Sequence, residues 1–188
     1  MDMKKTREEA LLLLEEYNET PALRRHAFAV EAVMRYFAEK RGEDPDYWAL
    51  VGLLHDLDYE KYPAEHCIKT REILEMKGYE ESFIRAIESH GYGICTEVEP
   101  LLPMEKVLYT IDELTGLIYA TVLMRPDRSI SNLELKSVKK KFETASFAQG
   151  VNREVISSGA KMLSMELDEV ITETIEGMKR AKDQLELN

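Results

Sequence analysis

The sequence predicts an all-α protein, a compact multi-helix bundle that forms a single domain over residues 1–188. Apolar residues recur at helical spacing along the whole chain, while strand-type alternation and hairpin sequences between β-branched runs are absent from it. The length of 188 residues is typical of one domain. With 44% hydrophobic residues, the chain can bury a sizeable core without disulfides or structural zinc.

Capping and stop signals set the bounds of the helices expected in the first two thirds of the chain. Thr6 and Glu9 have capping-box spacing, and Pro21 suits the first turn of a second helix that should stop at Gly42. An uncharged stretch at residues 114–124 predicts a buried core helix. We expect helices over about residues 6–17, 20–42, 44–55, 64–77, 80–90 and 104–124.

The last third of the chain carries two further capping signals. Ser131 with Glu134, and Ser146 with Gln149, have the spacing of capping boxes. We therefore expect two amphipathic helices over about residues 131–185, packed on a motif-bearing core at about residues 21–121.

Charge and cysteine content limit the compartment and the partners. The formal net charge of -11 disfavours long nucleic acids and anionic membranes, but it does not exclude a small phosphorylated substrate held by a cation. The opening residues MDMKKTREEA lack a signal-peptide core, and we expect a cytoplasmic protein. Cys67 and Cys95 lack CxxC spacing and are interpreted as packing residues. The oligomeric state is not indicated.

Four polar positions fall on helix faces that are otherwise apolar. His26, His55 and His90 each follow apolar residues at the three- and four-residue spacing that marks the inward stripe of a helix. Asp112 lies inside the long apolar helix. A single such histidine is more often a hydrogen-bonded core residue, but an interior carboxylate is costly unless a cation lies beside it. Together these positions therefore predict a metal site.

The adjacent His55 and Asp56 add a second argument for a metal. Neighbouring side chains diverge by about 100° on a helix, so both can reach one ion only where the helix ends, as expected here. Two imidazole nitrogens and two carboxylate oxygens suit Mn, Fe, Co, Ni or Zn and leave positions open for water and substrate. The predicted metal ligands are His26, His55, Asp56 and Asp112.

This ordered set resembles the HD-domain superfamily of metal-dependent phosphohydrolases. The resemblance rests on a His, the His55-Asp56 doublet and the later Asp112, and it covers residues 21–121. The surrounding segments HAFAVEAVMRYFAEKRG, WALVGLLHDLDYEKYPAEH, AIESHGY and VLYTIDELTGLI are similar to successive helices of such domains.

The resemblance implies a hydrolase that acts on a small phosphate ester, such as a nucleotide or a related phosphomonoester or phosphodiester. It implies one or two divalent transition-metal ions, with Asp56 as the catalytic residue that bridges two ions or accepts a proton from water. Some members hold a second ion with two further histidines, and His66 and His90 lie in the matching interval. The alternative for His66, expected in the first turn of its helix, is a surface capping role.

The doublet continues as HDLDYEK, unlike the branch of the family in which Gly-Lys follows it, so cyclic dinucleotide specificity is not carried over. Lys61 is a candidate substitute for that lysine. Lys140 and Arg153, from a basic segment at residues 136–153, are candidates for binding substrate phosphate; a solvated surface is the alternative.

Two other functions fit the same residues. Some relatives with six such ligands use a di-iron centre to activate oxygen, so a di-iron oxygenase is one alternative. A metal-stabilised ligand-binding module without catalysis is the other. Iron content with visible absorbance and oxygen consumption would favour the oxygenase, and tight ligand binding without turnover would favour the binding module.

Overall fold

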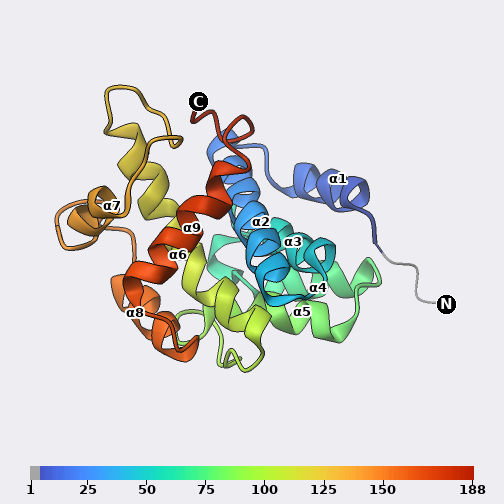
Figure 1. Ribbon diagram of the computed structural model, residues 1–188. Coiled ribbons are helices and arrows are strands. Elements are labelled where there is room, and N and C mark those ends of the chain that lie inside the picture. Colours follow the sequence, from blue (N-terminus) through green and yellow to red (C-terminus); the bar gives the residue numbers. More distant parts are fainter. Residues whose placement is uncertain (1–4) are drawn as a thin grey trace.

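The computed structural model describes residues 5–188, so residues 1–4 of the expected domain lie outside the described part (Figure 1). Within residues 5–188 the secondary structure is α-helical, with short 3-10 turns and an isolated bridge between Tyr92 and Thr96. The predicted all-α class is confirmed. The helices are α1 (Arg7–Tyr17), α2 (Pro21–Arg41), α3 (Pro45–Leu54), α4 (Ile68–Met76), α5 (Glu81–Glu88), α6 (Pro103–Leu123), α7 (Leu135–Phe142), α8 (Arg153–Met162) and α9 (Leu167–Lys179).

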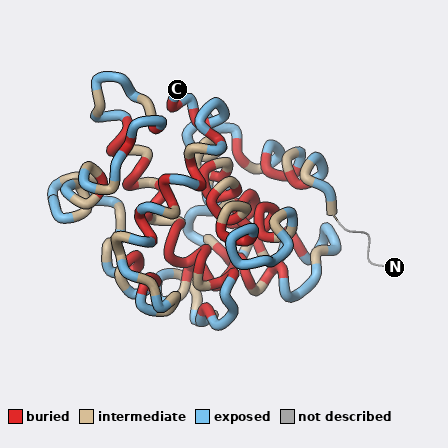
Figure 2. Tube along the Cα trace, in the orientation of Figure 1, coloured by how far each residue is buried: buried red, intermediate tan, exposed pale blue. Residues whose placement is uncertain are grey.

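The helices α2, α6 and α9 form the centre of the bundle. Each of the three packs against the other two, α3 covers another side of α2, and α7 and α8 pack on α6 (Figure 1). The buried hydrophobic residues form one continuous core. Along the chain trace, buried residues lie mainly inside the bundle and exposed residues on the outside (Figure 2). Among the described residues, no helix combines the length and apolar character that a membrane crossing requires.

A close approach between α2 and α3 positions the His-Asp doublet. A Cβ atom at Gly52 would lie 2.9 Å from Cγ of Met34 and 3.0 Å from the backbone oxygen of Val30, so a larger residue would push the two helices apart. Glycine therefore lets the C-terminal half of α3 lie directly against α2. This contact brings His55, the C-cap of α3, beside His26 on α2.

The helix expected at residues 64–77 is shorter than predicted. A 3-10 turn occupies Pro63–Glu65, and α4 begins only at Ile68, because Cys67 has a φ of 69° that an α-helix does not allow. His66 therefore lies before the helix rather than in its first turn. Likewise, the helix expected at residues 80–90 ends as α5 at Glu88 and continues as a 3-10 turn, Ser89–Gly91.

Both capping boxes predicted in the last third of the chain are wrong. The helix α7 begins after Glu134, and Asn152 caps α8 by accepting hydrogen bonds from the amides of Glu154 and Val155. The segment that contains Ser146 forms a loop because Arg153 donates hydrogen bonds to several of its carbonyl groups. Three helices, α7, α8 and α9, occupy the region where two were expected.

Candidate metal centre

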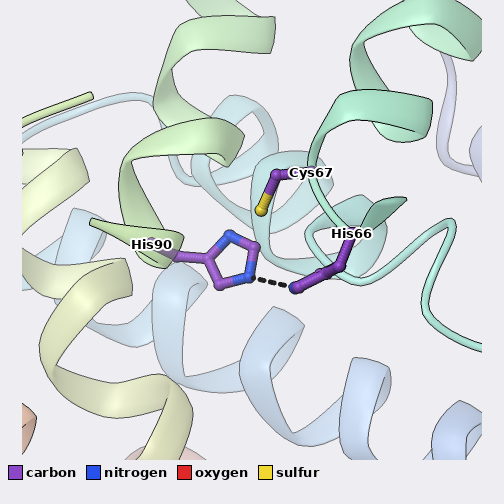
Figure 3. A group of neighbouring side chains, drawn as sticks. All are labelled: His66, Cys67 and His90. Carbon is purple, nitrogen blue, oxygen red and sulfur yellow. Dashed lines mark hydrogen bonds between the residues drawn. The ribbon is translucent and has the colours of Figure 1, made fainter. Parts of the chain in front are cut away.

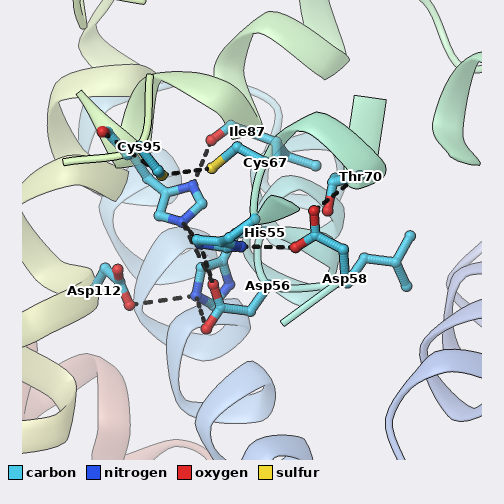
Figure 4. A network of polar contacts seen from close by, with 12 residues as sticks. His55, Asp56, Asp58, Cys67, Thr70, Ile87, Cys95 and Asp112 are labelled. Carbon is cyan, nitrogen blue, oxygen red and sulfur yellow. Dashed lines mark hydrogen bonds and ion pairs between the residues drawn. The ribbon is translucent and has the colours of Figure 1, made fainter. Parts of the chain in front are cut away.

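Six predicted ligand residues from five segments converge in the interior of the bundle. They lie in α2, at the end of α3, before α4, after α5 and in α6, so that residues far apart in sequence meet at one place (Figure 4). The set consists of His26, His55, Asp56, His66, His90 and Asp112.

The first group joins two imidazoles and two carboxylates. Nε2 of His26 lies 3.2 Å from Nε2 of His55 and 2.9 Å from Oδ1 of Asp112. Oδ2 of Asp56 lies 3.5 Å from Nε2 of His55 and 3.7 Å from Nε2 of His26. Adjacent ligands around an ion with bonds of about 2.0–2.2 Å lie roughly 3.0–3.5 Å apart. The separations are thus close to those of atoms that surround one divalent cation.

The second group contains the other oxygen of Asp56. Oδ1 of Asp56 lies 3.4 Å from Nε2 of His66 and 3.4 Å from Nε2 of His90. The two Nε2 atoms are 3.1 Å apart, and their side chains point toward one another (Figure 3). The carboxylate of Asp56 therefore faces two imidazoles on each side.

The hydrogen bonds of the histidines show which ring nitrogen carries the proton, and therefore whether the other nitrogen can bind a metal ion. Nδ1 of His55 donates to the backbone oxygen of Gly52 at 2.7 Å, and Nδ1 of His90 donates to that of Ile87 at 2.5 Å. Because a carbonyl oxygen only accepts, the proton of each neutral ring is on Nδ1, and Nε2 carries a lone pair.

The same orientation holds for the remaining two rings. Nδ1 of His66 donates to Oδ1 of Asp58 at 2.7 Å, and Nδ1 of His26 approaches the hydroxyl oxygen of Thr115 at 3.5 Å. Four lone pairs therefore converge on the carboxylates of Asp56 and Asp112. Such a cluster of acceptors repels itself unless cations or protons lie between its members, so these residues fit divalent ions.

The electrostatics of the cluster show the same need for positive charge. Burial by itself would raise the pKa of Asp56 and Asp112, but the imidazole of His55 and hydrogen bonds to neighbouring histidines outweigh it and hold both pKa values below their usual range. Burial opposes the charge on His90, yet its hydrogen bond to Asp56 and the nearby Asp112 raise its pKa to about 9. Without metal, protons on the histidines balance the carboxylates.

Asp58 is a supporting residue of the centre that the sequence pattern does not single out. Its side chain is fully buried; Oδ1 accepts from His66, and Oδ2 accepts from the backbone amide of Thr70 at 2.8 Å. It orients His66 and fixes that ring to the start of α4. The sequence places a second aspartate two residues after the doublet, but only the structure shows that its side chain turns toward His66.

A cavity of about 380 Å³ opens onto the cluster. Of the ligand residues, His26, Asp56, His66, His90 and Asp112 line it, together with Cys95 and the carboxylate of Glu113. Burial raises the pKa of Glu113, which accepts a hydrogen bond from the amide of Asn152. Of the described residues that line the cavity, none is Lys or Arg; its apolar wall consists of Leu23, Ile94, Val151 and Val155.

The three cations predicted to bind substrate do not lie in this cavity. Nζ of Lys61 donates to the backbone oxygen of Glu16 at 2.5 Å, on the outside of the bundle. Lys140 is exposed on α7. The guanidinium of Arg153 donates to backbone carbonyl groups between residues 141 and 151 and holds that loop together. Their spacing in the sequence did not reveal which way each side chain turns.

The arrangement of His and Asp side chains on an all-helical scaffold fits a metal-binding protein, and comparison with known proteins gives its family. The model of the HD domain matches residues 23–117, just over half of the chain. The protein belongs to the HD domain family. A search of curated proteins and a search of solved structures found no significant match.

Family membership gives the general chemistry. HD domains form a superfamily of mostly metal-dependent phosphohydrolases that bind divalent metal ions. The matched segment contains all six residues of the cluster. Within the described residues, His26, His55 and Asp112 form one group able to hold a metal ion, and His66 and His90, together with Cys67, form another.

Proposed function

We propose that this protein is a hydrolase of small phosphate esters, such as a nucleotide or a related phosphomonoester or phosphodiester, with two divalent metal ions. His26, His55, Asp56 and Asp112 would hold the first ion, and Asp56, His66 and His90 the second. The observation that carries the proposal is the position of Asp56, whose Oδ2 faces one pair of imidazoles and whose Oδ1 faces the other. A bridging carboxylate of this kind suits a two-ion centre.

The ions would supply Lewis acidity, which lowers the pKa of water and polarises a phosphoryl oxygen. The protein's own residues contribute orientation and charge. Hydrogen bonds from the Nδ1 atoms of His55 and His90 to backbone oxygens fix both rings with Nε2 toward the cluster. Asp56 can accept a proton from the attacking water only when one of its oxygens is free of an ion, so its role depends on how many ions are bound.

The cavity favours a small substrate. Because no Lys or Arg is among its described lining residues, positive charge for a phosphate would come from the ions themselves. The apolar wall can contact the rest of the substrate, and the carboxylate of Glu113 can accept hydrogen bonds from its hydroxyl or amino groups. A long polyphosphate would meet uncompensated negative charge from Glu113 and is disfavoured.

The proposal is tested by metal analysis followed by a substrate panel. The protein purified without added metal should contain transition-metal ions that are lost in His55→Ala. After loading with Mn²⁺ or Co²⁺, nucleoside monophosphates, dinucleotides and sugar phosphates are assayed anaerobically for phosphate or alcohol release. Turnover of at least one class, abolished by EDTA and restored by metal, is the expected result.

Two outcomes would overturn the proposal in favour of the alternatives. A pair of irons with visible absorbance and substrate-dependent oxygen consumption, without anaerobic hydrolysis, would indicate a di-iron oxygenase, which the same six ligands can serve. Tight binding of a phosphate ester without turnover under any metal would indicate a binding module. Absence of bound metal after reconstitution would remove the basis for all three functions.

Replacing Asp58 with asparagine is expected to weaken one ion position selectively. The substitution replaces the carboxylate that accepts the Nδ1 hydrogen of His66 with a neutral amide. Residues that hydrogen-bond to a metal-binding histidine contribute about 10–100-fold to metal affinity. Titration with Mn²⁺ should show a loss of that size for one ion and little change for the other. Asp127→Asn, at an exposed position, is the matched control. Equal weakening of both ions would contradict the assignment of His66 to a single position.

A further inference from the structure

The fold brings the two cysteines together beside the candidate metal centre. Cys67 and Cys95 come from segments 28 residues apart, and their Sγ atoms lie 3.2 Å from one another (Figure 4). Cys67 is completely buried, whereas Cys95 is half-buried and lines the cavity. Their spacing in the sequence predicts packing residues, but the structure gives them a common position with one sulfur accessible from the cavity.

The backbone is shaped around this pair. A Cβ atom at Gly91 would lie 2.3 Å from Sγ of Cys95 and 3.0 Å from Sγ of Cys67, so only glycine leaves room for both sulfurs. The amides of Ile94, Cys95 and Thr96 all donate to the backbone oxygen of Gly91, at 2.9–3.1 Å. These bonds hold Cys95 in a tight turn against Cys67.

We propose that Cys67 and Cys95 form a reversible disulfide that controls occupancy of the ion position at His66 and His90. A disulfide bond of about 2.05 Å requires the sulfurs to approach by little more than 1 Å. Cys67 directly follows His66, and Gly91, which lies against both sulfurs, directly follows His90, so movement of the sulfurs acts on the backbone beside both rings. Their Nε2 atoms are 3.1 Å apart, and a metal ion tolerates only small changes in such spacing.

The oxidant we assign is hydrogen peroxide. The accessible sulfur of Cys95 attacks one peroxide oxygen, the O–O bond breaks, and a sulfenic acid and one water form. The sulfur of Cys67 then attacks the sulfur of Cys95, the S–O bond breaks, and hydroxide leaves with the proton of Cys67 as a second water. Two thiols are oxidised to one disulfide, one peroxide is reduced to two waters, and a dithiol reverses the reaction.

The disulfide is tested by mass spectrometry and thiol titration of the Mn²⁺-loaded protein after peroxide treatment. We expect both thiols to disappear, the intact mass to fall by two hydrogen atoms, and a cross-linked peptide pair containing Cys67 and Cys95 that dithiothreitol separates. Oxygen atoms gained at Cys67 or Cys95, or two thiols that persist, would overturn the proposal.

Two variants control for the geometry. Gly91→Ala keeps both thiols but places a methyl group against both sulfurs, and we expect disulfide formation to slow by about tenfold or more. Cys95→Ser leaves Cys67 without a partner and should give no intramolecular cross-link. If Gly91→Ala formed the disulfide as fast as the unmodified protein, the space that Gly91 leaves for the two sulfurs would have no role, and the proposal would fail.

The effect of the disulfide on the ion position at His66 and His90 rests on the proposed two-ion centre. It is measured separately from formation of the disulfide. Elemental analysis should show two Mn²⁺ per reduced chain and one per oxidised chain, with the second restored by dithiothreitol and re-addition of Mn²⁺. The variant Cys95→Ser, which leaves Cys67 in place beside His66, should keep its metal content through peroxide treatment. Full occupancy in the oxidised protein would overturn the regulatory role. A reduced protein that binds a single ion would instead refute the proposed two-ion centre, while thiol titration still decides the disulfide.

Discussion

Replacing Asp56 with asparagine is expected to abolish metal-dependent hydrolysis while the helical fold is retained. Asparagine keeps the size of the side chain but removes its negative charge and one of two acceptor oxygens. Because Oδ1 and Oδ2 face different pairs of histidines, the variant loses the oxygen ligand at one proposed ion position and the negative charge at both. We expect turnover to fall by at least roughly 10²–10⁴-fold, the range for loss of a general acid or base alone.

The measurement combines phosphate release with elemental analysis. Asp56→Asn should bind fewer ions than the unmodified protein and show the same helical circular dichroism in EDTA. Asp183→Asn, which makes the same charge change at an exposed position near the C-terminus, should retain full activity and metal content. An active Asp56→Asn enzyme with two bound ions would remove Asp56 from the mechanism.

The sequence predicted where most helices begin and which faces turn inward, because capping residues and apolar periodicity are local properties. The box at Thr6, the stop at Gly42 and the long helix around Asp112 all appear in the structure close to the expected positions. These faces place His26, His55 and Asp112 in the interior, and the close packing of α2 against α3 and α6 brings the three side chains together. This part of the candidate site therefore followed from helix geometry.

The remaining part depends on the path of the loops, which periodicity does not reveal. Cys67 adopts a positive φ that delays the start of α4, and this break turns His66 toward the centre and brings Asp58 behind it. Likewise, the meeting of Cys67 and Cys95 depends on a turn built on the carbonyl group of Gly91. These contacts join segments that have no common sequence pattern, so the sequence could not predict them.

We expect the metal-free protein to lose stability as the pH rises from about 6.5 to about 9. Burial disfavours the charge on His90, but the hydrogen bond to Asp56 and the nearby Asp112 raise its pKa from 6.5 to about 9 in the metal-free fold. The folded chain therefore holds a proton that the unfolded chain releases. That stabilisation is complete below about pH 6.5 and is lost as the pH passes about 9. The difference corresponds to roughly 3 kcal/mol in the free energy of unfolding.

Thermal unfolding of the EDTA-treated protein across this range measures the effect. For a chain of this size, roughly 3 kcal/mol corresponds to about 6–12 °C in Tm. His90→Gln has no proton to release and should show a smaller decline. The metal-loaded protein should behave in the opposite way, because protons and ions compete for the same atoms and binding strengthens as the pH rises. A metal-free Tm that stays constant or rises from pH 6.5 to 9 would mean that protons do not balance the carboxylates at His90.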